Sequence, residues 1–380
     1  MKDARAPAAG VAGGVSDVAA VSARIVAEGV APNAAAGWAA RRADGQWELS
    51  AGGETDAFFD LASLTKPLTA MAIARSRHGA RALRGLELGQ ILAAARGTPS
   101  EHATLELLLA HRAGLEANLP LFRPLLDGGA VALDEALNEA ARARRSDAVG
   151  AIPPSGFAPV YSDLSYILAG EALVRERGVA DVGDALAELV VAPLGLTESL
   201  GSARSLEALG DAVRFEERVV PTEVVPWRGG EVRGRVHDEN AFALRGAGAC
   251  GHAGMFGTVS AVLSFGVAAL DAIARGRGPL AIEGPDDDLE WLVRPRAGGT
   301  LRAGFDGKSE GGGSTAGELA GPRTFGHLGF TGTSLWIDPD AEAVVVLLTN
   351  RVHPTRDNGA IRAARPRAHD ALFALAGRER

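Results

Sequence analysis

The two ends of the chain carry the same combination of elements, and this repetition restricts the folds that the chain can adopt. Residues 15–29 have the apolar spacing of a helix, and residues 34–52 read as the two strands of a hairpin. Toward the C-terminus, residues 332–350 again read as a hairpin and residues 367–377 as a helix. The economical arrangement is one antiparallel sheet that is built from both termini and flanked by helices, which is an α+β fold.

The region between the two ends is dominated by helical patterns and loops. Apolar residues recur with helical spacing in three segments, at residues 105–115, 133–144 and 161–178. We therefore expect a single domain over residues 1–380, in which a mainly helical lobe at about residues 76–250 is inserted into an α/β lobe. The α/β lobe would combine residues from about 15–75 with residues 251–380.

Charge and composition argue against several classes of partner. The formal net charge at pH 7 is −8 and no run of Lys and Arg stands out, so we expect no nucleic-acid partner. A membrane-spanning helix is not expected, because no apolar run reaches about 18 residues. The only cysteine, Cys250, cannot form an internal disulfide and is expected to be a buried spacer among small residues.

The start of the chain makes a poor export signal. Its apolar stretch consists mainly of Ala, Gly and Val and is interrupted by Asp17. We expect a cytoplasmic location, with a periplasmic or secreted one as the alternative, and the sequence leaves the oligomeric state open.

Ser63 and Lys66 form the first pattern with chemical content. The chain has only three lysines against 36 arginines, so a lysine three residues after a serine invites a chemical explanation. At the start of a helix, residues i and i+3 face the same way, and a partly desolvated lysine can take the proton of a serine hydroxyl. The alternative is a capping serine beside a solvated lysine.

Two further stretches accompany this pair. Tyr161 is one of only two tyrosines and begins the segment "YSD" after a loop rich in Pro and Gly. A tyrosine beside a lysine can share its protons and act as an acid or base, although an aromatic packed at a helix start is the alternative. Later in the chain, His327 opens "HLGFTG", in which Gly329 allows the backbone to approach a ligand closely.

In this order, the three motifs resemble those of the serine β-lactamase and penicillin-binding-protein superfamily. The likeness is strongest to the class C β-lactamase-like serine hydrolases, which include D-alanyl-D-alanine carboxypeptidases and family VIII esterases. The stretches that carry it are "DLASLTK", "LLLAHRAGL", "YSDLSYILAGEAL", "PLGLTES", "VHDENA", "GHAGMFGT", "HLGFTG" and "VVVLLTNR". They extend from about residue 58 to residue 351, so the resemblance covers most of the chain.

The resemblance implies a β-lactamase/transpeptidase-like fold and a role for each matching residue. Ser63 would be the acylated nucleophile, Lys66 its partner base and Tyr161 a second base. Asp163 stands where the family more often has Asn, and its negative charge should raise the pKa of Lys66. His327 stands where β-lactamases have Lys, and a neutral imidazole would hold an anionic substrate less firmly. Both departures favour ester or amide hydrolysis over efficient β-lactam hydrolysis.

The resemblance also implies how a substrate would be held. The backbone N–H groups of Ser63 and Phe330 would form the oxyanion hole, and Gly329 and Thr331 would line the substrate site. An alternative register takes Phe330, Thr331 and Gly332 as the third motif. The segment after the last strand can hold a substrate carboxylate in this family, and here Arg356 would do so.

No metal or cofactor is expected. The residues His237, Asp238, Glu239 and His252 lack a metalloprotease-like spacing, and "FDGKS" lacks the first glycine of a phosphate-binding loop. The sequence therefore predicts a metal-free serine hydrolase that forms an acyl-enzyme with a small-molecule or peptide substrate. An esterase, a D-amino-acid peptidase and a β-lactamase are not separated. The rival hypothesis is a catalytically silent binding or regulatory protein on the same fold.

Overall fold

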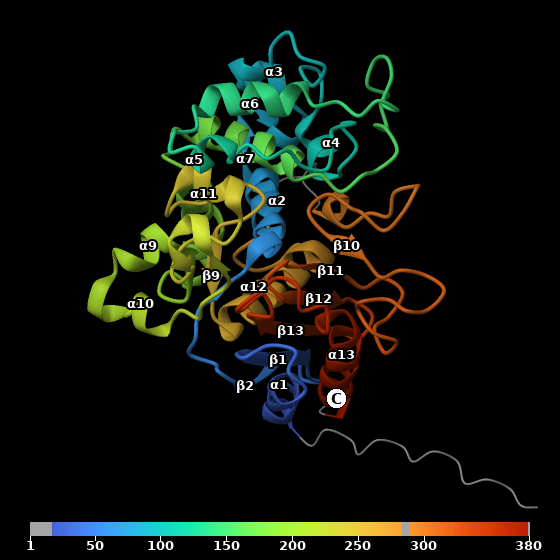
Figure 1. Ribbon diagram of the computed structural model, residues 1–380. Helices are drawn as coiled ribbons and strands as arrows, with labels where there is room; N and C mark the ends of the chain where they lie inside the picture. Colours follow the sequence, from blue (N-terminus) through green and yellow to red (C-terminus); the bar gives the residue numbers. More distant parts are fainter. Residues whose placement is uncertain (1–16, 283–288, 379–380) are drawn as a thin grey trace, which may run out of the picture.

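A computed structural model describes residues 17–282 and 289–378 (Figure 1). Its main feature is a six-stranded antiparallel sheet in the order β10-β11-β12-β13-β1-β2. The strands are β1 (Ala34–Arg41), β2 (Trp47–Gly53), β10 (Asp306–Gly307), β11 (Phe325–Leu328), β12 (Ser334–Asp338) and β13 (Ala343–Thr349). Because β1 pairs with β13 along its length, the two ends of the chain form one sheet, and the predicted α+β fold is confirmed.

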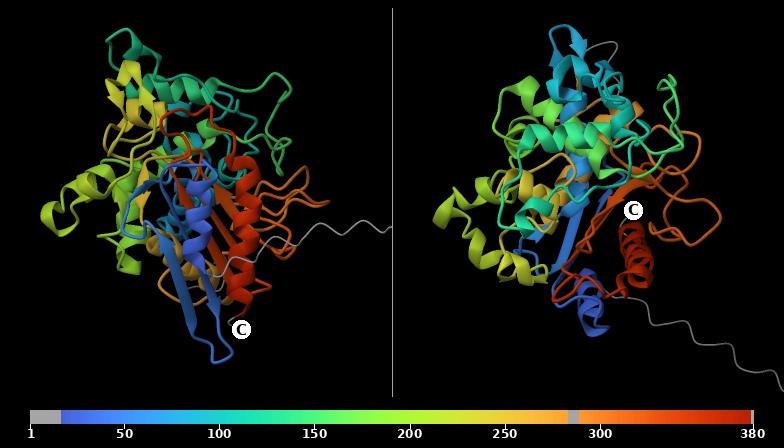
Figure 2. Two further views of the ribbon diagram at one scale, coloured as in Figure 1. Left: turned by 60° about the horizontal axis from the view of Figure 1, so that its bottom comes forward. Right: turned by 45° about the horizontal axis from the view of Figure 1, so that its top comes forward.

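Helices cover both faces of this sheet, so its central strands are apolar on both sides. The helices α1 (Val18–Ala27) and α13 (Ile361–Arg378) contact each other and lie on one face (Figure 2). On the other face, α12 (Val259–Arg275) packs against β1, β12 and β13. Every residue of β13 is buried, as expected for a strand between two helical layers.

Two helices in the C-terminal part of the chain differ from the sequence-based expectation. The 17-residue helix α12 was not predicted in the C-terminal part of the chain. It packs closely on the sheet at Gly37 and Gly266, where an added Cβ would lie 2.6 Å from Leu263 and 2.6 Å from Val344 respectively. The last helix begins at Ile361 rather than at residue 367, and Pro366 lies inside it.

Most of the regular elements in the middle of the chain are helices. Its helices are α2 (Thr65–Arg75), α3 (Leu88–Ile91), α4 (Leu105–Leu109), α5 (Arg123–Leu126), α6 (Leu133–Arg142), α7 (Asp163–Arg177), α8 (Val182–Leu186), α9 (Ala203–Glu207), α10 (Phe215–Arg218) and α11 (Glu239–Arg245). In Figure 1, α2 runs through the centre of the molecule, between the helices α3 to α7 above it and the sheet below. This position places the N-terminus of α2 near the end of β11.

Small sheets complete the fold. A three-stranded sheet in the order β3-β9-β6 joins β3 (Phe59–Asp60), β9 (Met255–Gly257) and β6 (Leu200–Ser202). Two short hairpins are formed by β4 (Arg77–His78) with β5 (Arg81–Ala82), and by β7 (Val224–Val225) with β8 (Gly230–Glu231). The predicted helical segment at residues 76–250 thus also contributes β6 to a sheet with strands from outside it. Within the described parts of the chain, we find no helix with the length and apolar character needed to cross a bilayer.

Candidate active site

Ser63 lies in a short 3₁₀ turn, Ala62–Leu64, that leads directly into α2. The turn follows β3, and Ala62 adopts a left-handed conformation with φ of 47°. Pro67 is the third residue of α2, where a missing N–H is tolerated. Ser63 and Lys66 therefore face the same side at the helix start, as the sequence predicted.

Lys66 is fully buried and its ammonium group has three acceptors. Its Nζ donates hydrogen bonds to Ser63 Oγ at 2.8 Å, to Asp163 Oδ1 at 2.7 Å and to the carbonyl oxygen of His252 at 3.2 Å. Three acceptors use all three N–H bonds of a protonated lysine. Lys66 is thus held as an ammonium ion beside the serine hydroxyl.

Two opposing effects act on the pKa of Lys66. Burial lowers this pKa, because a charged amine loses hydration, whereas the charges and hydrogen bonds of Asp163 and Tyr161 raise it. The net direction is upward from the usual value. The acidic side chain of Asp163 has the effect on Lys66 that the sequence predicted.

Tyr161 is the second side chain that contacts the Ser63 hydroxyl. Its hydroxyl donates a hydrogen bond to Ser63 Oγ at 2.9 Å. The ring stacks on His111 with centroids 4.7 Å apart and lies 4.9 Å from Lys66 Nζ. Burial raises the pKa of Tyr161, and the nearby Lys66 charge only partly offsets this rise. Ser63 Oγ therefore sits between two proton-carrying groups.

His327 lies on β11, with its ring next to that of Tyr161. The two rings are 5.9 Å apart, and His327 Nδ1 donates a hydrogen bond to the carbonyl oxygen of Leu328 at 2.8 Å. Burial and the charge of Lys66 lower the pKa of His327 to about 3, so the imidazole is neutral near pH 7. His327 is 5% exposed and is absent from the pocket lining, so its side chain does not face the pocket.

The chain after β11 closes on the Ser63 turn. A Cβ at Gly329 would lie 1.9 Å from Thr333 Oγ1 and 2.6 Å from the carbonyl oxygen of Leu61, so only glycine fits there. Phe330 follows, and its ring is half exposed at the pocket. In the described part of the chain, the backbone N–H groups of Ser63 and Phe330 donate to no protein acceptor.

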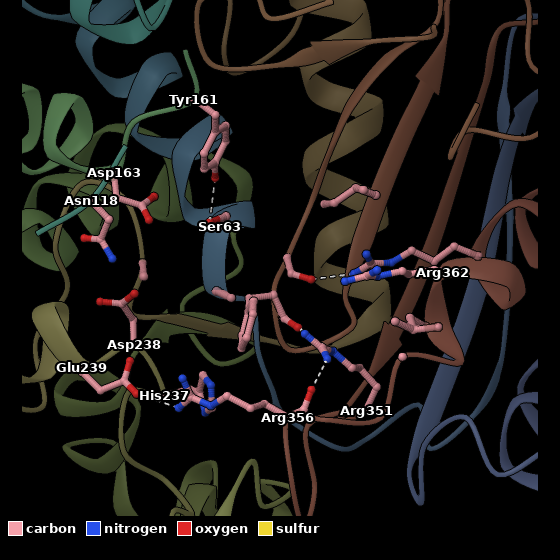
Figure 3. Close-up of a pocket in the computed structure, with 18 of the residues that line it drawn as sticks. Ser63, Asn118, Tyr161, Asp163, His237, Asp238, Glu239, Arg351, Arg356 and Arg362 are labelled. Atoms are coloured by element: carbon pink, nitrogen blue, oxygen red, sulfur yellow. Dashed lines mark hydrogen bonds and ion pairs between the residues drawn. The ribbon is translucent and has the colours of Figure 1, made fainter. Parts of the chain in front are cut away.

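A pocket of about 560 Å³ opens in front of Ser63 (Figure 3). Asn118 and the acidic side chains of Asp163, Asp238 and Glu239 lie along one side of the pocket, and Arg351 and Arg362 lie along the other (Figure 3). Arg356 extends across to Glu239.

Arg351, in the segment after the last strand that was expected at the rim of the cleft, lines the pocket. Lining residues that the sequence analysis did not assign to substrate binding include Asn118, Asp238, Glu239, Arg362 and Arg365. The stretch "VHDENA" contains two of these five, and the other three have no motif around them.

The family model described as Beta-lactamase matches residues 5–369 of the chain. The chain belongs to the β-lactamase family. A protein of Escherichia coli (strain K12) that is provisionally named as a D-alanyl-D-alanine carboxypeptidase is 27% identical to this β-lactamase-family chain over 202 residues. That alignment covers 51% of this chain and 45% of the relative, so the chain spans about half the length of this curated relative.

Solved structures show the same fold at low sequence identity. A class C β-lactamase from Rhodobacter sphaeroides is 17% identical with a TM-score of 0.63, and the match covers 94% of this chain and 98% of that one. EstCE1, described as a hydrolase with promiscuous acyltransferase activity, is 20% identical with a TM-score of 0.63, and the match covers 94% and 97% of the two chains. The β-lactamase/transpeptidase-like fold implied by the sequence motifs is thereby confirmed.

Two residues of this β-lactamase-family protein do not sit as predicted for substrate contact. Thr331 is 1% exposed and its hydroxyl donates to the carbonyl oxygen of Asp60 at 2.7 Å, so its side chain does not face the pocket. Arg356 does line the pocket, but its guanidinium is bound by Glu223 at 2.6 Å and by Glu239 at 2.6 Å. Because two carboxylates already bind Arg356, its charge is not free for a substrate.

Arg362 is the better placed cation. It is exposed on the first turn of α13 and lines the pocket (Figure 3). Among the residues described by the structure, its guanidinium has no hydrogen-bond or ion-pair partner. Arg365 and Arg351 lie beside it and donate hydrogen bonds to backbone carbonyl oxygens, and Arg351 also packs on the Phe330 ring. Neither of them forms an ion pair with a carboxylate among the described residues. This side of the pocket is therefore positively charged.

His252 and Cys250 are buried, and neither side chain lines the pocket. His252 Nε2 lies 2.8 Å from Asp238 Oδ1, and Cys250 is buried, which raises the pKa of its thiol. Across residues 17–282 and 289–378, no group of three or more His, Cys, Asp or Glu side chains is arranged to hold a metal ion.

Proposed function

We propose that the protein is a metal-free serine hydrolase that forms an acyl-enzyme on Ser63 with an ester, amide or β-lactam substrate. The observation that carries this proposal is the position of Ser63 Oγ, which lies 2.8 Å from Lys66 Nζ and 2.9 Å from Tyr161 OH. A serine becomes nucleophilic when a neighbouring group can take its proton, and both neighbours are within reach. A binding protein without catalysis would not need a buried lysine at this position.

In the acylation step, Ser63 Oγ attacks the carbonyl carbon and its proton passes to the Lys66–Tyr161 pair. The two groups are coupled, so the reactive form is the one in which the pair has lost one proton. The carbonyl oxygen becomes negatively charged and accepts hydrogen bonds from the N–H groups of Ser63 and Phe330. The tetrahedral intermediate then collapses, and the pair returns the proton to the leaving group.

In deacylation, water takes the place of Ser63 as the nucleophile, and Ser63 becomes the leaving group. A water molecule gives its proton to the Lys66–Tyr161 pair and attacks the acyl carbon. The bond to Ser63 Oγ breaks, and the pair returns the proton to the serine. The substrate acid is released and the resting site is restored.

The charge of Asp163 sets the pH range of this mechanism. Asp163 raises the pKa of Lys66, so the Asp163→Asn variant should lower that pKa. The acid limb of kcat/KM, which requires loss of one proton from the pair, should then move to lower pH. Because the pKa values of Lys66 and Tyr161 are both raised, the wild-type rate should still be rising at pH 10, whereas that of Asp163→Asn should level off at lower pH. Hydrolysis of a p-nitrophenyl ester between pH 6 and 10.5, corrected for the uncatalysed rate, measures this difference.

A matched control is Asp357→Asn, which removes a carboxylate at the rim of the same pocket. Its profile should coincide with that of the wild type. An acid limb of Asp163→Asn that stays in place or moves to higher pH contradicts the assignment of this limb to the Lys66–Tyr161 pair.

Arg362 is expected to hold an anionic group of the substrate. The Arg362→Ala variant should raise KM about 10-fold for a carboxylate-bearing peptide or β-lactam, equivalent to about 1.4 kcal/mol. A neutral p-nitrophenyl ester should be almost unaffected. The control is Arg367→Ala, on the same helix but paired with Glu28. Equal losses on the charged and neutral substrates would assign Arg362 a structural role instead.

The substrate class is tested with nitrocefin, a p-nitrophenyl ester and a D-Ala-D-Ala peptide. Turnover of at least one of these by the wild-type protein, with an initial burst of product, is expected for an acyl-enzyme. We expect the ester or the peptide to be turned over faster than nitrocefin, because the third motif supplies no cation: His327 is neutral and lies outside the pocket lining. Absence of turnover with all three, together with absence of a covalent adduct, would favour the silent binding protein.

A further inference from the structure

Asp60, the last residue of β3, is a buried acid that the mechanism above does not use. Its Oδ1 accepts a hydrogen bond from the N–H of Ala62 at 2.8 Å, and its Oδ2 accepts one from the N–H of His237 at 2.7 Å. Burial raises its pKa to about 6, so the group is mostly ionised at pH 7. The carboxylate joins the turn that carries Ser63 to the pocket wall at residues 237–239.

The turn that Asp60 holds has an unusual backbone. Ala62 has a φ of 47°, in the left-handed region that is unfavourable for residues other than glycine. Such a conformation persists when the surrounding structure holds it in place. The hydrogen bond from the Ala62 N–H to Asp60 is one such restraint, and the next residue along the chain is Ser63. The direction of the Ser63 N–H therefore depends on this turn.

The loop that carries Phe330 is fastened to the same segment. Thr331 Oγ1 donates to the carbonyl oxygen of Asp60 at 2.7 Å, and Thr333 Oγ1 donates to the carbonyl oxygen of Leu61 at 3.0 Å. Both threonines are buried. The close approach of the two segments requires glycine at position 329, because a Cβ added there would collide with Thr333 and with the carbonyl oxygen of Leu61. Phe330 directly precedes the first of these two attachment points along the chain.

From these contacts we infer that Asp60 and Thr331 are positioning residues, which fix the separation of the two oxyanion-hole N–H groups. One donor, on Ser63, is set by the side chain of Asp60. The other, on Phe330, is set through the hydroxyl of Thr331 on the backbone of Asp60. This inference rests on the proposed acyl-enzyme function. It also explains why Thr331 is buried although it belongs to the third motif.

The test uses substitutions that keep the side-chain shape. Thr331→Val removes the hydroxyl and should lower kcat about 10-fold with little change in KM, because a misplaced donor weakens transition-state binding. Thr331→Ser keeps the hydroxyl and should retain most of the activity. Asp60→Asn places an amide NH₂ against a backbone N–H and should lower kcat by about 10-fold or more. A boronic acid that adds to Ser63 should lose affinity in proportion to kcat/KM.

Controls separate this role from a loss of stability. Thr98→Val removes another buried hydroxyl, which donates to the Ala95 carbonyl outside the pocket lining, and should leave kcat unchanged. If Asp60→Asn fails to fold, the comparison of Thr331→Val with Thr331→Ser still tests the inference. Equal activity of Thr331→Val and Thr331→Ser, or an effect on KM alone, overturns the positioning role. The proposed function is unaffected by that result as long as the wild-type protein hydrolyses its substrate. Absence of any Ser63 adduct in the wild type would overturn the proposed function itself.

Discussion

Replacing Ser63 with alanine is expected to abolish hydrolysis, with a fall in kcat of about 10⁴-fold or more. The hydroxyl is the only nucleophile placed between Lys66 and Tyr161, at 2.8 Å and 2.9 Å respectively. Alanine keeps the backbone N–H of residue 63, so part of the oxyanion hole remains and some residual rate above that of water is expected. Hydrolysis of the best substrate, followed by product absorbance, measures this loss.

The fold of the Ser63→Ala variant should be unchanged, because the small side chain lies at the pocket surface. A melting temperature within a few degrees of the wild type checks this. Ser264→Ala, on α12 and outside the pocket, serves as the matched serine control. Activity of Ser63→Ala at more than a few per cent of the wild type would mean that another group performs the reaction.

Replacing Lys66 with methionine is expected to slow acylation by about 10³-fold. Methionine has a similar volume, whereas arginine would be too long for a fully buried site with three hydrogen bonds. The loss has two sources, since the variant removes the proton acceptor and leaves the Asp163 carboxylate without its partner. Stopped-flow measurement of the burst phase isolates the acylation step.

The double variant Lys66→Met/Asp163→Asn separates these two sources. If the lysine acts in proton transfer, removing the unpaired Asp163 charge should restore stability but leave acylation slow. Recovery of acylation to near the wild-type rate in the double variant would show that Lys66 only neutralises Asp163.

The pairing of the two chain ends was predictable because each end repeats a hairpin and a helix. In the N-terminal hairpin, for example, the sequence Asp44-Gly45 is typical of the turn between two strands. Gly45 adopts the positive φ, 85°, that such a tight turn requires. The helix α12 was missed because its polar stripe is narrow: Ser260, Ser264, Asp271 and Arg275 recur at helical spacing, but all the other positions are apolar or glycine. Pro366 likewise obscured the first turns of α13, although the structure accommodates it inside the helix.

The candidate site was predictable where residues close in sequence carry it. Ser63 and Lys66 meet through one helical turn, and Tyr161 and Asp163 follow from motif order, so the structure places all four together. Their catalytic roles stay predictions. The partners of Arg356 were not predictable, because Glu223 and Glu239 lie 133 and 117 residues away along the chain.

The sequence also could not predict whether the side chains of Thr331 and Arg362 are bound within the protein or free. Nothing in "HLGFTG" indicates that the Thr331 hydroxyl turns back to the carbonyl of Asp60, a residue 271 positions earlier. Nothing around Arg362 distinguishes it from 35 other arginines until its neighbours are known. Contacts between distant segments decide whether a polar side chain is bound within the protein or free for a ligand.

Covalent labelling tests the central claim most directly. The wild-type protein is incubated with a fluorophosphonate, its intact mass is measured, and the adduct is located by peptide mapping. We predict one adduct per chain, on Ser63, and no adduct on the Ser63→Ala variant. An adduct on another residue such as Cys250, or continued substrate turnover by a wild-type protein that stays unlabelled, would contradict the acyl-enzyme mechanism.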